Sequence, residues 1–182
     1  MVVEDEPDIY EVLLAMFEMW GIEGVAFVDG EEAVAWIDDV DNRRFQGELP
    51  ELALLDIRLP GDIDGAGVGE RLRKSPVLGR IAIVLTTAFR LKPDEEESII
   101  TRSGADKLIY KPLPKFNQLQ RLLEEVIAQR RVKAAQQVPA QSIRARAIVP
   151  QPEMRPEPKP KPKLEAEPNK AETKSQDKPG NA

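Results

Sequence analysis

The 182-residue sequence contains no cysteine and no histidine. Without cysteine, disulfide bonds, thiolate metal sites and thiol nucleophiles are excluded. Without histidine, the chain lacks the usual general base, the usual zinc ligand and any phosphohistidine of its own. Any catalytic or metal-binding chemistry must therefore come from carboxylates, hydroxyls, amides and amines.

Long apolar runs are also missing. None approaches the ~20 residues that a helix needs to span a bilayer. The first residues, Met1 to Asp5, lack the basic start and the apolar core of a signal peptide. We therefore expect a cytoplasmic protein that does not insert into membranes.

The charge is distributed unevenly along the chain. Residues 131–182 carry 11 Lys and Arg against 6 Asp and Glu, a net of +5, which leaves a net of −11 for residues 1–130. A strongly acidic segment is a poor surface for nucleic acid, but it suits a site that holds a divalent cation.

Proline marks a change of composition toward the end of the chain. Nine of the 16 prolines lie in residues 131–182, where Ala147-Ile148-Val149 forms a short apolar island. Such a segment buries too little apolar surface to offset the entropy of ordering it. We therefore predict a folded domain over residues 1–130, with a last helix that extends to about residue 137, and a disordered Pro/Lys/Glu-rich tail over residues 138–182.

Within the folded part, five short apolar segments alternate with five amphipathic ones. The expected strands lie at about 1–3, 25–28, 52–56, 81–86 and 108–110, and the helices that follow them at about 7–20, 30–37, 66–74, 93–103 and 114–137. The predicted buried face of the first helix consists of Ile9, Val12, Leu13, Met16, Phe17 and Trp20. Gly67 and Gly69 weaken the third helix by about 1 kcal/mol each. The alternation predicts an α/β fold, a parallel sheet with helices on both faces and right-handed crossovers.

Polar residues follow four of the five expected strands. Glu4 and Asp5 follow the first strand, Asp56 the third, Thr86 and Thr87 the fourth, and Lys111 the fifth. Each of them could merely cap its own loop. The carboxyl ends of parallel strands share one edge of the sheet, however, so these side chains are expected to converge on one crevice.

The chemistry that such a set could share is specific. Clustered carboxylates repel one another and need a cation, and a site of hard oxygens favours Mg²⁺, with Mn²⁺ as the other candidate. An aspartate carboxylate can attack phosphorus and form an aspartyl phosphate. A lysine and a threonine hydroxyl can then contact the oxygens of the phosphoryl group.

At this point the sequence resembles a known family, the receiver domain of bacterial two-component response regulators, of the chemotaxis-regulator type. The resemblance covers about residues 1–130. The motifs that carry it, in the family's order, are Val2-Val3-Glu4-Asp5-Glu6-Pro7, Asp56-Ile57-Arg58-Leu59-Pro60, Asp64-Gly65, Leu85-Thr86-Thr87-Ala88, Gly104-Ala105-Asp106 and Lys111-Pro112.

The resemblance implies a flavodoxin-like doubly wound sheet of five parallel strands in the order 2-1-3-4-5. It also implies a role for each polar residue. Asp56 is expected to be the phospho-acceptor. Mg²⁺ is expected to be held by Glu4, Asp5 and Asp56 together with the backbone carbonyl of Arg58. Thr87 is expected to be the switch hydroxyl (or Thr86, if the register slips by one), and Lys111 is expected to contact the phosphoryl group and to precede a cis bond to Pro112.

The implied function is that of a phosphorelay receiver. A histidine kinase or a histidine phosphotransfer protein donates the phosphoryl group, and the charge gained at Asp56 changes a surface that binds an unknown downstream protein. Neither nucleic acid nor an external substrate is expected to take part, so the chain is not expected to be a turnover enzyme.

Two alternatives stay open at this point. The first is a pseudo-receiver or scaffold that signals by binding alone. It is favoured by the short first strand, which has either lost residues or begins upstream, and by Leu108, which stands where the family usually has an aromatic residue. The second is a phosphohydrolase of the haloacid dehalogenase type. That class has a second acid two residues after its nucleophile, where this sequence has Arg58.

Overall fold

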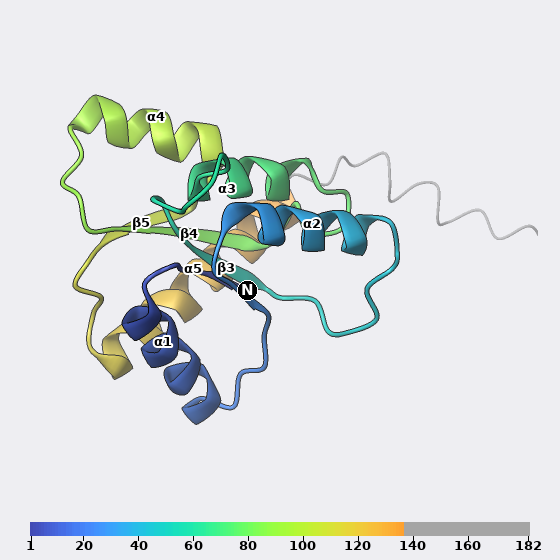
Figure 1. Cartoon of the computed structure of the whole chain (residues 1–182), viewed down its shortest axis with the longest axis horizontal. Coiled ribbons are helices and arrows are strands. Elements are labelled where there is room, and N and C mark those ends of the chain that lie inside the picture. Colours follow the sequence, from blue (N-terminus) through green and yellow to red (C-terminus); the bar gives the residue numbers. More distant parts are fainter. Residues whose placement is uncertain (137–182) are drawn as a thin grey trace, which may run out of the picture.

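The computed structural model describes residues 1–136, so the tail predicted for residues 138–182 lies outside the described residues. Strands and helices alternate along the chain (Figure 1). The strands are β1 (Val2–Val3), β2 (Ala26–Phe27), β3 (Leu52–Asp56), β4 (Ala82–Thr87) and β5 (Lys107–Tyr110). The helices are α1 (Pro7–Met19), α2 (Gly30–Asp41), α3 (Gly65–Lys74), α4 (Pro93–Ser103) and α5 (Phe116–Gln136).

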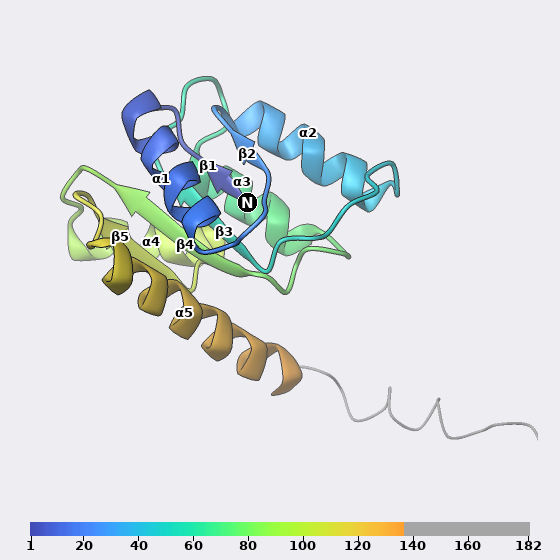
Figure 2. The same ribbon diagram turned by 90° about the horizontal axis from the view of Figure 1, so that it is seen from below.

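The five strands form one parallel sheet in the order β2-β1-β3-β4-β5, as predicted. Helices α2, α3 and α4 cover one face of the sheet, and α1 and α5 cover the other (Figures 1 and 2). All strand carboxyl ends therefore lie at one edge, where the polar residues of the candidate site follow them.

Side chains of β3 alternate between two apolar cores. Ala53 and Leu55 pack into the core beneath α2 and α3, whereas Leu54 packs into the core beneath α1 and α5. A strand with both faces covered is apolar throughout, which is why this stretch reads as a continuous hydrophobic run. Asp56 is the first residue of the run that can carry charge.

Helices α2 and α3 each begin at an aspartate that caps the first turn. The Asp29 carboxylate accepts a hydrogen bond of 2.7 Å from the backbone N–H of Glu32, and the Asp64 carboxylate accepts one of 2.7 Å from that of Gly67. At the carboxyl end of α4, Gly104 adopts a left-handed conformation with φ of 62°, which suits a residue without a side chain.

The predicted buried face of the first helix is wrong at Val12, which is 52% exposed. Leu13 is fully buried, and the other predicted residues pack around it in the core beneath α1 and α5. Val12 lies outside this narrow stripe because α1 contacts the rest of the protein along one line only. The helix period identified the stripe but not its width.

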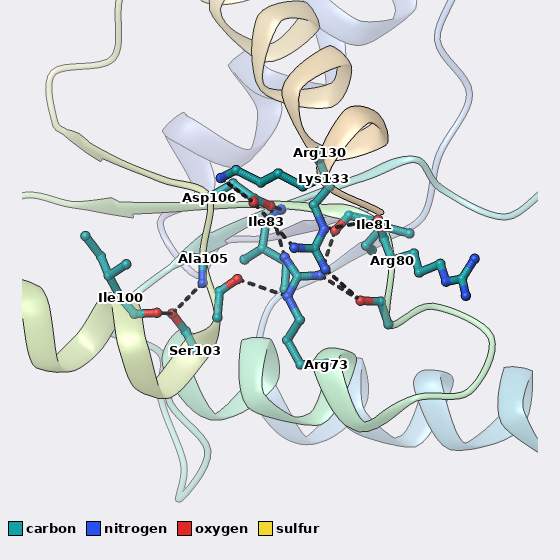
Figure 3. A network of polar contacts seen from close by, with 12 residues as sticks. Arg73, Arg80, Ile81, Ile83, Ile100, Ser103, Ala105, Asp106, Arg130 and Lys133 are labelled. Atoms are coloured by element: carbon teal, nitrogen blue, oxygen red, sulfur yellow. Dashed lines mark hydrogen bonds and ion pairs between the residues drawn. The ribbon is translucent and has the colours of Figure 1, made fainter. Parts of the chain in front are cut away.

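A polar cluster ties several elements together at the amino ends of β4 and β5 (Figure 3). The buried carboxylate of Asp106 lies 3.0 Å from the guanidinium of Arg73, 3.7 Å from that of Arg130 and 3.8 Å from the Lys133 ammonium. Arg73 also donates to the backbone carbonyls of Gly79, Ile81 and Gly104. The cluster joins α3 and α5 to the loops that precede β4 and β5.

None of the helices within residues 1–136 is both long enough and apolar enough to cross a membrane.

Candidate functional site

A small cleft of about 190 Å³ opens at the carboxyl edge of the sheet. It is lined by Asp5, Glu6, Asp56, Arg58, Thr87, Ala88, Phe89 and Lys111. Asp56 and Thr87 end β3 and β4, and the others come from the loops after β1, β3, β4 and β5. Of the residues predicted to converge, Asp5, Asp56, Thr87 and Lys111 line this cleft, whereas Glu4 and Thr86 do not.

Asp56 is the last residue of β3 and is 5% exposed. One carboxylate oxygen lies 3.1 Å from the Lys111 ammonium, and the other accepts a hydrogen bond of 3.0 Å from the backbone N–H of Arg58. Burial raises the pKa of Asp56 above its ordinary value, because it outweighs the attraction of Lys111 and the hydrogen bond from Arg58. Asp56 thus caps its own loop through the N–H of Arg58 and also lines the cleft, where it meets Lys111.

Lys111 follows β5 and bridges the acidic groups. Its ammonium donates hydrogen bonds to Glu4 at 2.8 Å and to Glu6 at 3.0 Å, in addition to its contact with Asp56. Burial alone would lower the pKa of Lys111, but these acceptors and the Asp56 charge raise it above its ordinary value. Lys111 therefore carries a full positive charge at neutral pH. The peptide bond between Lys111 and Pro112 is cis, as the resemblance implied.

Three carboxylates could share a cation. Oxygen atoms of Glu4, Asp5 and Asp56 all lie within 4.8 Å of one another. Glu4 is buried, at 2% exposure, and Asp5 is exposed. One ammonium cannot neutralise this group together with Glu6, so the cluster keeps an excess of negative charge. An all-oxygen set with this excess fits a hard divalent ion such as Mg²⁺.

Both candidate hydroxyls lie on β4, but only that of Thr87 belongs to a residue that lines the cleft. Thr87 lines the cleft, and its hydroxyl accepts a hydrogen bond of 3.2 Å from the backbone N–H of Phe89. Thr86 pairs with Asp56 in the sheet and is not among the lining residues. Its hydroxyl lies 3.4 Å from the Leu55 carbonyl and 3.5 Å from a carboxylate oxygen of Asp56. The placement thus favours Thr87 over Thr86 as the hydroxyl that a bound group would meet.

Three side chains that line the cleft were given no role from the sequence, namely those of Glu6, Arg58 and Phe89. The Arg58 guanidinium stacks 3.6 Å from the centre of the Phe89 ring, which places a cation–π contact beside the cleft. Glu6 adds a carboxylate to the Lys111 cluster. A signal for each exists in the sequence, since Glu6 continues the run Glu4-Asp5 and Phe89 lies two residues after Thr87.

Glycine makes the close approach between β3 and α3 possible. A Cβ atom on Gly65 would lie 1.9 Å from the carbonyl oxygen of Asp56. The N–H of Gly65 also donates a hydrogen bond of 3.1 Å to the Ile57 carbonyl. The first residue of α3 is thereby held directly against the backbone of Asp56.

The position expected to hold an aromatic residue is filled by Leu108, which packs into the core beneath α2 and α3. Tyr110, two residues later, lies on the same face of β5 but does not line the cleft. Its hydroxyl donates to Glu96 at 2.8 Å, and the Arg90 guanidinium lies 4.8 Å from its ring centre. Neither of these two β5 side chains lines the cleft.

Comparison with known proteins adds independent findings. The family model for the response regulator receiver domain matches residues 1–124. The probable transcriptional regulator ycf27 of Cyanophora paradoxa is 36% identical over 112 residues, which cover 62% of this chain and 41% of the relative. The polar-differentiation response regulator DivK of Brucella anthropi is 32% identical over 118 residues, which cover 64% of this chain and 87% of the relative. The chain thus matches less than half the length of the transcriptional regulators, but most of the length of DivK.

Solved structures agree. A CheY-like response regulator receiver domain protein from Methanospirillum hungatei shares the fold, with a TM-score of 0.58 at 23% identity over 72% of this chain and 94% of that one. The receiver domain of a sensor histidine kinase from Pseudomonas aeruginosa, with a magnesium ion coordinated in its active-site cleft, has a TM-score of 0.56 at 28% identity over 70% of this chain and 94% of that one. On the family match, the fold and the arrangement of the cleft, this chain belongs to the receiver domains of two-component response regulators.

Proposed function

We propose that Asp56 accepts a phosphoryl group from a phosphohistidine on a histidine kinase or a histidine phosphotransfer protein. The observation that carries this proposal is the placement of a buried Asp56 carboxylate 3.1 Å from the Lys111 ammonium, within a group of three carboxylates. A loop cap needs neither the lysine nor the neighbouring acids. Transfer of phosphorus to a carboxylate needs both positive charge and an open approach.

The transfer exchanges one bond for another. An Asp56 carboxylate oxygen forms a bond to phosphorus as the P–N bond of the phosphohistidine breaks, and the departing imidazole keeps the electron pair. Lys111 stays protonated throughout and neutralises one phosphoryl oxygen. The Thr87 hydroxyl, at the wall of the cleft, donates to another.

Glu4, Asp5, Asp56 and the backbone carbonyl of Arg58 would hold the metal ion, Mg²⁺ or in its place Mn²⁺. When bound, the ion supplies the positive charge that the carboxylate group lacks. Asp56 is then the only site of chemistry, and the chain modifies itself without turning over an external substrate.

The output of this switch is a contact with another protein. Residues 1–130 carry a net charge of −11, which opposes binding of nucleic acid by the receiver itself. The curated relatives named as transcriptional regulators extend well beyond the part that this chain matches. Their transcriptional role is therefore not carried over.

Intact-mass measurement of the full chain after incubation with phosphoramidate tests the proposal. A single phosphate adduct is expected with Mg²⁺ or Mn²⁺ and is expected to disappear with a chelator or in Asp56→Asn. Asp39→Asn removes an exposed carboxylate that does not line the cleft, so this matched variant should still form the adduct. Absence of an adduct under every condition would instead support a pseudo-receiver, and steady release of phosphate from a small phosphoester would support a phosphohydrolase.

A further inference from the structure

A groove of about 890 Å³ opens at the amino ends of β1, β2 and β3, between α1 and α5. Its wall is mainly apolar, and Leu14, Ile22 and Leu49 expose large side chains there. This edge of the sheet is opposite the cleft that holds Asp56. An exposed apolar wall of this extent favours a binding surface.

The rim of the groove is acidic. Five of its lining residues are glutamates, Glu18, Glu23, Glu48, Glu51 and Glu124, and within residues 1–136 no lysine or arginine lines it. An apolar floor with an acidic rim fits a peptide that combines apolar and basic side chains. An acidic peptide or an anionic surface would be repelled.

The chain itself contains a segment of that character. It runs Ile143-Arg144-Ala145-Arg146-Ala147-Ile148-Val149. Residues 134–152 contain these two arginines and no acidic residue. Every other basic residue in residues 137–182 has a proline or an acidic residue within two positions of it.

The end of α5 lies beside the groove. Leu123 and Ile127 of α5 line it, and Arg131 forms an ion pair with Glu51 on its rim. On the other side of the helix, Arg130 and Lys133 face Asp106, which fixes the direction of the last turns (Figure 3). Gln136, where α5 ends, is five residues beyond Arg131, or about 8 Å along the helix axis.

The groove is close enough to the end of α5 for residues 143–149 to reach it. Six residues lie between Gln136 and Ile143, and the seven Cα-to-Cα steps of an extended chain reach roughly 23 Å. We propose that residues 143–149 dock in the groove of their own chain, with the aliphatic side chains on the apolar floor and the two arginines on the glutamate rim. This contact is independent of phosphorylation at Asp56.

The contact is reversible. Exposed ion pairs contribute only about 0.2–1 kcal/mol each, so the short tether, which provides an effective concentration in the millimolar range, supplies much of the occupancy. A partner protein with a similar basic and aliphatic segment then competes with the tail for the groove. The tail thereby sets a threshold for such a partner.

Paramagnetic relaxation in the full chain tests this proposal. The sequence has no cysteine, so Ala145→Cys accepts a nitroxide label at a single site. We expect the amide signals of Ile22 and Leu49 to lose most of their intensity, and to recover it when the nitroxide is reduced. A label at Ala171→Cys, farther along the chain, is the matched control and should leave these signals nearly unchanged.

Charge exchange checks the specificity. In the chain labelled at Ala145→Cys, Glu48→Lys with Glu124→Lys should restore the groove signals, because the rim then repels the arginines. Adding Arg144→Glu with Arg146→Glu should broaden these signals again, because the charges are once more opposite. The amide spectrum of each variant shows directly whether the domain is folded. Unbroadened groove signals, or equal broadening from both labels, would overturn the proposal. So would broadening of an isotope-labelled chain by a separate nitroxide-labelled chain, because that result indicates docking in a second copy.

Discussion

Lys111 makes three contacts with carboxylates at the edge of the sheet, and two of the acids, Glu4 and Asp56, are buried. A buried charge without a partner costs far more than an exposed one. Lys111 therefore has a structural task in addition to its proposed contact with a phosphoryl group. Its charge offsets the mutual repulsion of acids that the fold brings close together.

Lys111→Met should lower the free energy of unfolding by about 3 kcal/mol in metal-free buffer, because Glu4 and Asp56 lose their cation. The same change should tighten Mg²⁺ binding, since the competing ammonium is gone. Urea unfolding with a chelator and a Mg²⁺ titration measure the two effects. Lys74→Met, which removes an exposed pair with Glu70, is the control and should cost less than about 0.5 kcal/mol. A Lys111 variant as stable as this control would contradict the assignment.

At the residue scale, the sequence predicted the polar cluster because each member directly follows an apolar strand. The proximity of Asp56 and Lys111 could be predicted from one rule, that parallel strands have their carboxyl ends at one edge of the sheet. The stacking of Arg58 on Phe89 could not be predicted, because it depends on how two loops fold over the cleft. Contacts between loop side chains have no period in the sequence.

At the scale of elements, α3 and α4 pack closely at Gly69. A Cβ atom there would lie 2.9 Å from the Cβ of Ser103 and 3.0 Å from its carbonyl oxygen. Ser103 is fully buried at the end of α4, where its hydroxyl donates to the Ile99 carbonyl at 2.7 Å. The glycine that weakens α3 by propensity thus allows α4 to approach it.

Gly69→Ala should destabilise the protein by about 1–3 kcal/mol, because overpacking outweighs the roughly 1 kcal/mol gain in helix propensity. Gly67→Ala is the matched comparison in the same helix. An added Cβ there would meet only side-chain atoms, of Asp64 at 3.2 Å and Ile63 at 3.3 Å, so the cost should be smaller. Thermal unfolding of both variants decides, and equal stability of the two would contradict the packing argument.

The α2–α3 contact depends on pH through Asp41. Burial alone would raise the pKa of Asp41, but hydrogen bonds from Ser75 and Arg71 outweigh it and bring that pKa below its ordinary value of 3.8. The ionised form is therefore favoured by folding. Its stabilising contribution is present above the ordinary pKa and is lost as the pH falls through the lowered one.

Asp41→Asn should consequently be less stable than the wild type near neutral pH, and the difference between them should shrink as the pH falls below about 4. Chemical unfolding of both proteins across that range measures it. A difference that stays constant down to about pH 2 would show that shape, rather than charge, accounts for the effect.

Sequence periodicity predicts the order of strands and helices, but not how each helix contacts its neighbours. The strand and helix order was predictable because every strand is a short apolar run and every helix has an apolar stripe. Val12 was misplaced because a stripe in the sequence does not reveal how much of a helix surface its neighbours cover. The role of Gly69 was also hidden, because propensity describes one helix and close packing involves two.

At the scale of the whole molecule, Asp106 joins α3, α5 and the amino edge of the sheet. Its carboxylate accepts hydrogen bonds from Arg73 at 3.0 Å and from the backbone N–H of Ile83 at 3.1 Å. Burial lowers the pKa of Arg73 to about 10, with a further contribution from the charge of Arg130. The cluster thus holds several cations around one buried anion.

Asp106→Asn should lower the free energy of unfolding by about 3 kcal/mol, because Arg73 and Arg130 lose their countercharge in a buried setting. Hydrogen exchange should also show faster opening of the last turns of α5, which contain Arg130 and Lys133. The exposed pair between Asp39 and Arg44 provides the control, and Asp39→Asn should cost less than about 1 kcal/mol. A stable variant with an unchanged exchange rate in α5 would refute this role.

The cleft and the groove lie at opposite edges of the sheet, and within residues 1–136 no residue lines both. Substitutions that alter one should therefore leave the chemistry of the other intact. Selection, natural or in the laboratory, can then change which partner occupies the groove without retuning the acceptor at Asp56. The two edges of one sheet can evolve as separate traits.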